Sequence, residues 1–256
     1  MIVTPESIQA MREEHDLADR VLPKSVAVIM DGNGRWAQQR GMPRILGHRE
    51  GAKAVRTIIG GAARLGLEAL ALYSFSQQNW SRPEEEINAL MHLYTQYLIE
   101  ERKTIMDHNV RLRHIGSRDG LPEMVLDALD ETTRISAGNT GMDLCLALNY
   151  GGREEIVSAA QRVAKRVQEG CMKPEDITES VFAAALDTGG ILDPDLLIRT
   201  SGEMRLSNFM LWQISYSEFY VTDVHWPDFG VEEFKTALRS YGGRKRRYGG
   251  LNDSDS

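Results

Sequence analysis

The chain has few of the features that secreted or membrane-embedded proteins need. Its 256 residues include two cysteines, Cys145 and Cys171, which lie far apart and outside any metal-binding spacing. Neither a disulfide framework nor a structural zinc site is therefore expected. No apolar run approaches the ~20 residues of a membrane-spanning helix, and residues 1–20 lack the apolar core of a signal peptide. These absences predict a cytoplasmic protein, with Cys145 as a packed core residue.

An excess of positive charge is also absent. The chain has 30 Lys and Arg residues against 37 Asp and Glu residues, a formal net charge of −7. This balance argues against general nucleic-acid affinity, so any local cluster of basic residues needs a local reason. The composition is that of an ordinary globular protein, and at this length a single domain is the simpler expectation.

Short apolar runs that resemble strands alternate along the chain with segments of helical periodicity. The expected strands cover residues 25–30, 67–75, 110–115, 142–148, 196–198 and 218–224. The expected helices cover residues 51–66, 83–105, 121–135, 154–167, 174–186 and 207–214. This alternation predicts an α/β fold, a single domain with a mostly parallel central sheet flanked by helices. The domain is expected over residues 25–250, between a leader at 1–24 and a short tail at 251–256.

The turn after the first expected strand contains an unusual group of residues. The apolar run ends at Asp31, and Gly32-Asn33-Gly34 and Arg35-Trp36 follow. The glycines predict a tight turn into a helix, which presents backbone N–H groups and an arginine beside a carboxylate. Ligands of parallel sheets bind outside the carboxyl ends of the strands, so an anion site is expected here. A turn without a ligand is the alternative.

Residues 32–37 also fit the dinucleotide-binding pattern G-x-G-x-x-A. A dinucleotide site needs an acid for the ribose at the end of the second strand, but the sequence there is Ser74-Phe75-Ser76-Gln77. Asp31 would also repel a pyrophosphate unless a cation lay between them. The pattern alone is a weak signal, and the missing acid together with the position of Asp31 disfavours a nicotinamide or flavin enzyme.

A second signal is a group of basic side chains in loops that follow strands. They are Arg35, Arg44, His48, Arg82, Arg199 and Arg205. The planar fork of arginine matches phosphate oxygens in a bidentate way, which lysine cannot do. Several arginines and few lysines in an acidic protein indicate a small polyphosphorylated substrate. Diphosphate chemistry usually needs Mg²⁺, held by one or two carboxylates with phosphate oxygens and water, and Asp31 and Glu218 are the candidates.

Several longer motifs follow one another along most of the chain. They are Asp-Gly-Asn-Gly-Arg-Trp (31–36), Gly-His (47–48), Asn-Trp-x-Arg-Pro (79–83), Asn-Tyr-Gly-Gly-Arg (149–153), Ile-Arg-Thr-x-Gly-Glu-x-Arg-Leu-Ser-Asn-Phe (198–209), Trp-Gln-x-x-Tyr-x-Glu (212–218) and Asp-x-x-Trp-Pro-Asp-Phe (223–229). Together they resemble the cis-prenyltransferase family, and within it the bacterial undecaprenyl diphosphate synthases. The resemblance covers residues 25–250.

The resemblance implies a specific reaction. Isopentenyl diphosphate is condensed repeatedly onto an allylic diphosphate, typically farnesyl diphosphate, and each new double bond is cis. The product would be a long polyprenyl diphosphate that carries cell-wall polysaccharide. A Mg²⁺ cofactor, a homodimer and at most peripheral membrane contact are implied. The growing hydrocarbon must leave water, and the apolar stripe at 87–98, facing 55–65 and 142–148, is the expected wall of a hydrophobic tunnel beside the sheet.

The resemblance also implies roles for residues. Asp31 would bind Mg²⁺, with Glu218 as second ligand, and assist departure of the allylic diphosphate, while Asn79 would help to remove the proton. The allylic diphosphate would be held by Gly32, Asn33, Gly34, Arg35, Arg44 and His48. Isopentenyl diphosphate would be held by Arg199, Arg205 and Ser207. Further substrate-binding residues would be Trp36, Ser76, Gln77, Gln78, Trp80, Arg82 and Leu206. Arg247 and Gly249 would reach the isopentenyl site of the partner subunit.

Two positions depart from the family pattern, since Gln78 stands where the family usually has Glu and Ser201 where it usually has Gly. The missing acid at 78 removes a charge near this loop, which bears on metal delivery and on the rate of product release, and neither departure is expected to remove activity. The Asp-Asp-x-x-Asp clusters of trans-prenyltransferases are absent. Two alternatives stay open. One is a short-chain cis-prenyl synthase, because product length depends on tunnel depth; the other is a non-catalytic polyprenyl-binding subunit, which the retained Asp31 and Asn79 disfavour.

Overall fold

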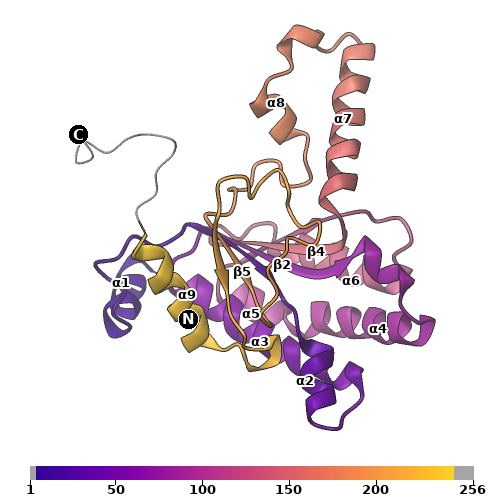
Figure 1. Cartoon of the computed structure of the whole chain (residues 1–256). Helices are drawn as coiled ribbons and strands as arrows, with labels where there is room; N and C mark the ends of the chain where they lie inside the picture. Colours follow the sequence, from indigo (N-terminus) through magenta and orange to yellow (C-terminus); the bar gives the residue numbers. More distant parts are fainter. Residues whose placement is uncertain (1–3, 245–256) are drawn as a thin grey trace.

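Among residues 4–244, which this computed structural model describes, six parallel strands form one sheet (Figure 1). The strands are β1 Ser25–Ile29, β2 Ala69–Ser76, β3 Arg111–Ile115, β4 Asp143–Tyr150, β5 Leu196–Arg199 and β6 Glu218–Val221. Their order across the sheet is β3-β4-β2-β1-β5-β6, and each neighbouring pair is parallel. The predicted α/β class is confirmed, and the sheet is parallel throughout.

Both faces of the sheet are buried. Successive residues of a strand point to opposite faces, so Val26 and Val28 join one apolar layer while Ala27 and Ile29 join the other. Coverage on both sides explains why the strands read as continuous apolar runs instead of alternating ones. Cys145 lies in the second layer, as expected, and its burial raises the pKa of the thiol to about 12.

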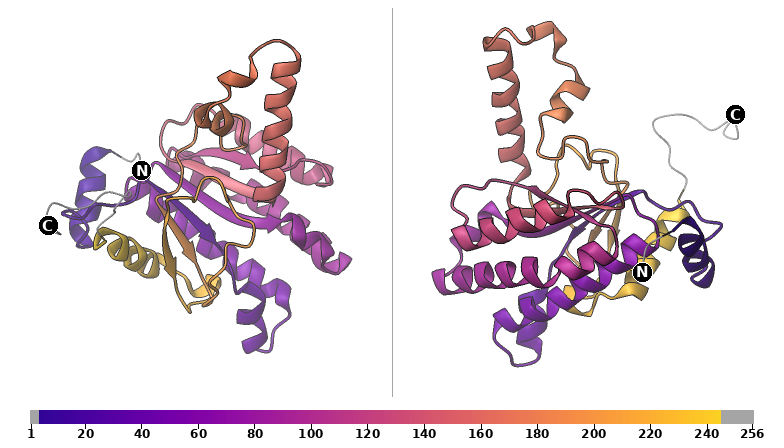
Figure 2. Two further views of the ribbon diagram at one scale, coloured as in Figure 1. Left: turned by 45° about the horizontal axis from the view of Figure 1, so that its top comes forward. Right: turned by 180° about the vertical axis from the view of Figure 1, so that it is seen from behind.

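Helices surround the sheet. The α-helices are α1 Pro5–Glu14, α2 Asn33–Gln39, α3 Arg44–Arg64, α4 Glu84–Glu100, α5 Arg102–Asp107, α6 Glu123–Ser136, α7 Gly152–Gln168, α8 Glu179–Ala184 and α9 Val231–Gly242. The 3₁₀ helices are η1 Gln77–Ser81, η2 Pro174–Asp176 and η3 Trp226–Asp228. Helices α3, α4 and α6 lie across one face of the sheet, as seen from behind in Figure 2. Helices α7 and α8 project away from the body (Figure 1).

Some helix boundaries differ from those expected. Helix α3 begins at Arg44, whereas the prediction placed its start near residue 51. The prediction missed the first turns because they are mostly polar and lie outside the hydrophobic periodicity. The helix expected over 83–105 is divided into α4 and α5, which meet at Glu101. Residues 174–186 likewise divide into η2 and α8. Helix α9 was not predicted.

The segment 207–214, expected to be helical, is a series of turns. Ser207, Asn208 and Met210 have φ angles of 50°, 61° and 45°, a left-handed conformation that ends a right-handed helix. The first turn of α7 holds the segment in this form. The N–H of Gly152 donates to the Asn208 carbonyl at 2.7 Å, and the N–H of Arg153 donates to Asn208 Oδ1 at 2.9 Å.

The N-terminal segment contributes a peripheral helix. Helix α1 packs against α3, and Arg12 Nε donates to the Leu65 carbonyl at 2.9 Å. In Figure 1 it lies beside α9, and Arg239 Nη2 donates to the His15 carbonyl at 3.1 Å between the two segments. Within residues 4–244, no helix has both the length and the apolar character that crossing a membrane requires.

Candidate active site

The turn after β1 places Asp31 at the carboxyl edge of the sheet. Gly32 has a φ of 99°, and a Cβ atom there would lie 1.9 Å from Ser201 Oγ, so only glycine fits. Helix α2 begins at the next residue, Asn33, as the glycines predict. The first N–H groups of a helix have no intrahelical acceptor, and they are available to an anion.

The carboxylate of Asp31 is held by two arginines. Arg199 Nη2 donates to Oδ2 at 2.9 Å, Arg35 Nη2 lies 3.1 Å from Oδ1, and the N–H of Gly32 donates to Oδ1 at 2.7 Å. Burial acts to raise the pKa of Asp31, but the hydrogen bonds from Arg199 and Arg35 outweigh it and hold the pKa below its ordinary value. Asp31 is therefore ionised at neutral pH.

A second arginine group extends from the end of β5. Arg199 Nη1 donates to Ser207 Oγ at 2.8 Å and to the Arg205 carbonyl. Glu203 joins this group to the first, since it pairs with Arg205 and, at 3.1 Å, with Arg35. Arg199 thus contacts Asp31 directly, and Arg205 is linked to the same group through Arg199 and Glu203.

Asp31, Arg199 and Arg205 lie on one side of the entrance to a cavity, which we call the mouth. The opposite side of the mouth is built from the start of α3 and the first turn of α4. Glu86 Oε1 accepts from Arg82 Nη1 at 3.0 Å, and Glu86 Oε2 lies 3.7 Å from Arg44 Nε. Burial, with the nearby charges of Arg82 and Arg44, lowers the pKa of His48 to about 4, so the imidazole is neutral at pH 7. Its buried Nε2 has no hydrogen-bond partner within the described chain. More guanidinium groups than carboxylates surround the mouth, which suits a diphosphate.

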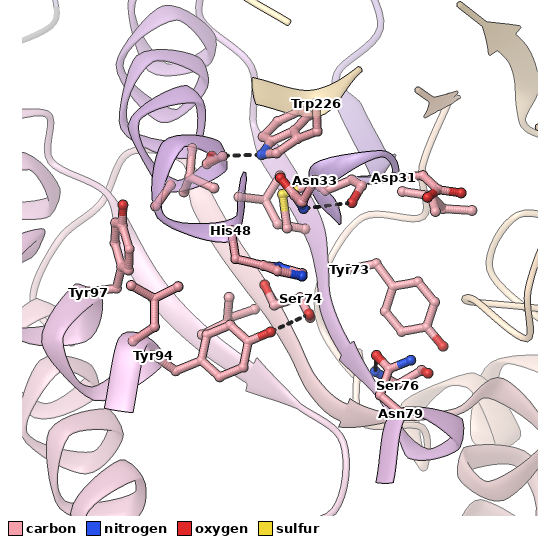
Figure 3. Close-up of a pocket in the computed structure, with 18 of the residues that line it drawn as sticks. Asp31, Asn33, His48, Tyr73, Ser74, Ser76, Asn79, Tyr94, Tyr97 and Trp226 are labelled. Atoms are coloured by element: carbon pink, nitrogen blue, oxygen red, sulfur yellow. Dashed lines mark hydrogen bonds between the residues drawn. The ribbon is translucent and has the colours of Figure 1, made fainter. Parts of the chain in front are cut away.

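A cavity of about 380 Å³ extends from this mouth between the sheet and helices α3 and α4. Its apolar lining comes from Val55, Ile59, Leu72, Leu93, Leu98, Ile105, Leu112, Leu144 and Leu146. In Figure 3, Tyr94 and Tyr97 lie on the α4 side, with Asp31 and Asn79 on the side of the strand ends and His48 between them. Tyr94 Oη donates to the Ser74 carbonyl at 2.6 Å, which fixes α4 over β2.

The apolar stripe of α4 lines this cavity only in part. Tyr94, Tyr97 and Leu98 line it, as expected, whereas Leu90 and Met91 pack in the core at 1% and 2% exposure. The difference arises because a helix covered on more than one side needs a wide apolar stripe, of which one edge faces the cavity.

The η1 loop carries Asn79 to the edge of the cavity. Ser76 and Asn79 both line it, and the N–H of Ser76 donates to Asn79 Oδ1 at 3.1 Å (Figure 3). Trp80 holds the loop from behind, because its Nε1 donates to Asn149 Oδ1 at 2.8 Å. Asn149 Nδ2 in turn donates to the carbonyls of Ser117 and Asp119. The motif at 149–153 contains Asn149, but its pattern alone gave no role for this residue.

Some predicted substrate-binding residues lie outside the cavity lining. Trp36 does not line the cavity, and its Nε1 donates to Asp228 Oδ1 at 2.7 Å. Gln77 and Trp80 border a shallower pocket beside Asn149, Gln78 is exposed, and Leu206 packs against the second apolar layer. Gly34 lies against the Arg44 guanidinium, where a Cβ atom would approach within 2.6 Å. Arg247 and Gly249 lie outside the described residues.

Glu218 does not lie near Asp31. It begins β6, where it aligns with Leu196 of β5 and so with Val26 of β1. Asp31 follows the opposite end of β1, and roughly 17 Å of strand separates the two levels. Glu218 Oε2 accepts from Arg244 Nη1 at 2.6 Å. The prediction that Glu218 shares a metal ion with Asp31 is therefore wrong within one chain, because parallel strands place their starts and ends on opposite edges.

Behind Asp31 lies a hydrogen-bonded relay that the sequence did not indicate. Gln39 Nε2 lies within hydrogen-bond distance of His225 Nε2, at 3.1 Å. Nδ1 lies 2.7 Å from Ser201 Oγ, which donates to the Asp31 carbonyl at 2.9 Å. Thr200 Oγ1 donates to the same carbonyl at 2.7 Å. The backbone of Asp31 is thus fixed from behind while its carboxylate faces the cavity.

Comparison with known proteins agrees with this arrangement. A sequence family described as "Putative undecaprenyl diphosphate synthase" matches residues 29–249. An isoprenyl transferase of Rhodopirellula baltica is 52% identical over 231 residues, which cover 90% of this chain and 95% of that protein.

Solved structures show the same fold. Lavandulyl diphosphate synthase from Lavandula x intermedia, in complex with dimethylallyl diphosphate, has a TM-score of 0.87 and 39% identity, covering 90% of this chain and 99% of that one. A probable undecaprenyl diphosphate synthase from Campylobacter jejuni has a TM-score of 0.73 and 31% identity, covering 89% of this chain and 99% of that one. By its sequence and its fold, the chain belongs to the undecaprenyl diphosphate synthase family of prenyltransferases.

Proposed function

We propose that this prenyltransferase elongates an allylic diphosphate, such as farnesyl diphosphate, by repeated condensation with isopentenyl diphosphate and forms a long cis-polyprenyl diphosphate. One observation carries the proposal: a single cavity joins an arginine-rich mouth to an apolar interior. A diphosphate with a hydrocarbon tail has this division of polarity. The tail gains ~0.8 kcal/mol for each CH₂ group removed from water, and the mouth supplies charge to the head.

The mouth offers two places for diphosphates. We assign the allylic diphosphate to the first turn of α2 with Arg35, Arg44 and His48, because helix N–H groups and guanidinium groups both favour phosphate oxygens. We assign isopentenyl diphosphate to Arg199, Arg205 and Ser207.

The residues of the mouth fit a Mg²⁺ ion that is bound largely by substrate. Asp31 supplies one ionised carboxylate, and among residues 4–244 no group of three or more His, Cys, Asp or Glu residues could hold a metal by itself. Mg²⁺ commonly takes one or two carboxylates together with phosphate oxygens and water. When bound, the ion would neutralise charge that develops on the departing diphosphate.

In the proposed reaction, the allylic C–O bond breaks and its electron pair leaves with the diphosphate. The double bond of isopentenyl diphosphate supplies the electrons of the new C–C bond, and a proton is then lost. Arg35 and the N–H groups of α2 are positioned before the reaction to stabilise the leaving group. Asn79 lines the same cavity as Ser207, and we assign it to the side from which the proton departs.

We also propose a homodimer, a cytoplasmic location and peripheral membrane contact during product release, with the product serving as the lipid carrier of cell-wall polysaccharide. The dimer proposal is supported by β6, which is an edge strand with exposed apolar side chains nearby. Phe219 is 45% exposed and Tyr216 is 77% exposed, and an exposed edge strand is a template on which another chain can pair.

A short-chain cis-prenyl synthase is the second candidate. The similarity to lavandulyl diphosphate synthase, at a TM-score of 0.87, favours it. The two candidates share the arrangement of the mouth and differ in the length of product that the cavity accepts.

The test incubates purified protein with farnesyl diphosphate, radiolabelled isopentenyl diphosphate and Mg²⁺, and then separates the products by chain length. A ladder that ends at a long product supports the proposal. A single short product supports the second candidate, and the absence of any elongation refutes both. Mass measurement in solution tests the dimer.

A further inference from the structure

Trp226 is a buried residue to which the proposed reaction assigns no role. It begins η3, is 1% exposed, and lines the cavity together with Asp31 and His48. Its ring stacks on Phe229, with a centroid distance of 5.6 Å and an interplanar angle of 19°. Packing alone would be met by a phenylalanine, as at the equally buried Phe229. The group that tryptophan adds is the indole N–H, which usually has a hydrogen-bond partner when it is buried.

Two hydrogen bonds from Trp226 join segments on the two sides of the proposed allylic diphosphate site. Its backbone N–H donates to the Asp31 carbonyl at 3.0 Å, in the turn that leads into α2. Its indole Nε1 donates to the Gly51 carbonyl at 2.7 Å, in the second turn of α3. Figure 3 shows the ring near Asn33 and Asp31, with the bond to α3 as a dashed line. One residue therefore ties the turn after β1 to α3.

Glycines on α3 make this close approach possible. A Cβ atom at Gly51 would lie 2.9 Å from Trp226 Cδ1 and 2.1 Å from Asn33 Oδ1. A Cβ atom at Gly47, one turn earlier on the same face, would lie 1.8 Å from the Asn33 carbonyl oxygen. Contacts this close leave α3 little freedom to rotate or to slide, because interiors packed at this density deform little.

The position of α3 matters because this helix carries half of the proposed site. Arg44 and His48 are four residues apart on α3 and so lie on one face of it, whereas Arg35 and the free N–H groups belong to α2. The segment η3 packs against both helices. It holds α2 through Asp228, which accepts from Trp36 Nε1 at 2.7 Å, and α3 through Trp226.

On the basis of the proposed function, we infer that Trp226 is a positioning residue, which holds Arg44 and His48 of α3 in place relative to Asp31. Without the indole N–H, the Gly51 carbonyl still lies within a helix and the fold survives, but the first turns of α3 lose their tie to the turn after β1. A diphosphate that spans the two helices must then order them when it binds, and its affinity falls.

The first experiment compares wild type with Trp226→Phe, which removes the indole N–H and keeps an aromatic ring and the backbone bond to Asp31. Trp212→Phe is the matched control, because it makes the same chemical change where Trp212 packs against Phe182 of α8 at a centroid distance of 4.8 Å. Circular dichroism establishes that each variant is folded. Hydrogen–deuterium exchange without ligand should be faster over residues 44–54 in Trp226→Phe and unchanged there in Trp212→Phe. Unchanged exchange in Trp226→Phe, or an equal increase in Trp212→Phe, overturns the inference.

Binding separates a positioning role from a general loss of stability. The probe is a farnesyl diphosphate analogue with sulfur in place of the bridging oxygen, and calorimetry measures its affinity in the presence of Mg²⁺ without turnover. We expect affinity about fivefold to tenfold weaker in Trp226→Phe, the equivalent of one hydrogen bond, and unchanged in Trp212→Phe. Arg44→Gln should cost less affinity in Trp226→Phe than in wild type, because a displaced Arg44 has less to lose. Strictly additive losses overturn the inference.

Two other outcomes are also decisive. If wild type neither binds the analogue nor elongates a substrate, the proposed function fails, and exchange over residues 44–54 still decides whether Trp226 holds α3. If Trp226→Phe does not fold, a tryptophan analogue with sulfur in place of the indole N–H is incorporated at position 226. That analogue keeps the shape of the ring and removes only the donor, so the same criteria apply to it.

Discussion

Replacement of Asp31 by alanine tests the centre of the site, because it removes the carboxylate and leaves the neighbouring arginines in place. The change deletes the acceptor of Arg199 Nη2, of one Arg35 contact and of the Gly32 N–H. Arg199 keeps its bonds to Ser207 and to a backbone carbonyl, and Arg35 keeps its ion pair with Glu203. The variant therefore weakens the mouth without leaving either guanidinium unpaired.

The size of each effect follows from these contacts. Hydrogen bonds to charged groups contribute about 1.5–3 kcal/mol, but the Asp31 side chain is 28% exposed and water replaces part of the loss. We expect the free energy of unfolding to fall by about 2 kcal/mol, a decrease in Tm of about 4–8 °C. Turnover should fall by about 10²–10³, the usual cost of removing a preorganised group that stabilises developing charge.

Thermal unfolding measures the first quantity, and incorporation of labelled isopentenyl diphosphate measures the second. Asp130→Ala is the control, since it removes a carboxylate that is 59% exposed and paired with Arg118, for which we expect less than about 1 kcal/mol and unchanged turnover. Asp31→Asn keeps an oxygen for Arg199 and should retain stability while losing turnover. An Asp31→Ala enzyme within about tenfold of wild-type turnover would refute this account, because it falls below the ~10²-fold effect expected.

Two further predictions concern residues around the mouth. Ser201 has a φ of 73°, so Ser201→Gly should relieve about 1 kcal/mol of backbone strain and lose hydroxyl bonds of similar value to Asp31 and His225. Thermal unfolding should show a net change below about 1 kcal/mol, and a loss above about 3 kcal/mol would contradict this balance. His48 is expected to make stability depend on pH, because burial, then Arg82 and Arg44, lower its pKa from 6.5 to about 4. Between these values the unfolded chain binds the proton more readily, so stability falls as the pH falls, by about 2 kcal/mol from pH 7 to pH 5. Urea unfolding of His48→Gln should lack this part of the dependence, and an equal slope in both proteins would contradict the prediction.

The sheet could be predicted because its signals are local. Val26 and its neighbours form an apolar run that suits a strand covered on both faces, and the Gly32 turn that follows requires a left-handed residue. The motifs from residue 31 to residue 229 indicated the family, which the comparisons confirm. Asp31, Arg199 and Arg205 were expected in one site because each follows a strand that ends at the same edge, and the cavity lining contains all three.

Other features depend on contacts between distant segments, and the sequence pattern did not predict them. One helix was missed although its local signal was present. The turns at 207–214 exist because Asn208 bonds to the start of α7, which no local pattern of that segment reveals. The His225 relay behind Asp31 joins residues nearly two hundred positions apart in the sequence, at distances no spacing encodes. By contrast, α9 buries Phe234, Leu238 and Tyr241 at helical spacing, so a reading of periodicity could have found it.

The two helices beside the cavity are joined by ion pairs at two levels. Helix α3 presents Arg44 at the mouth and Arg56 further along, and α4 meets them with Glu86 and with Glu101 at its end. Between these polar contacts the facing surfaces are apolar, with Val55 and other α3 residues opposite the α4 stripe. Because an α-helix has a fixed rise per residue, the number of residues between these two contacts fixes how far apart they lie along α3 and α4. A change in the number of residues between these pairs would shift the apolar residues of one helix relative to those of the other, without altering the mouth.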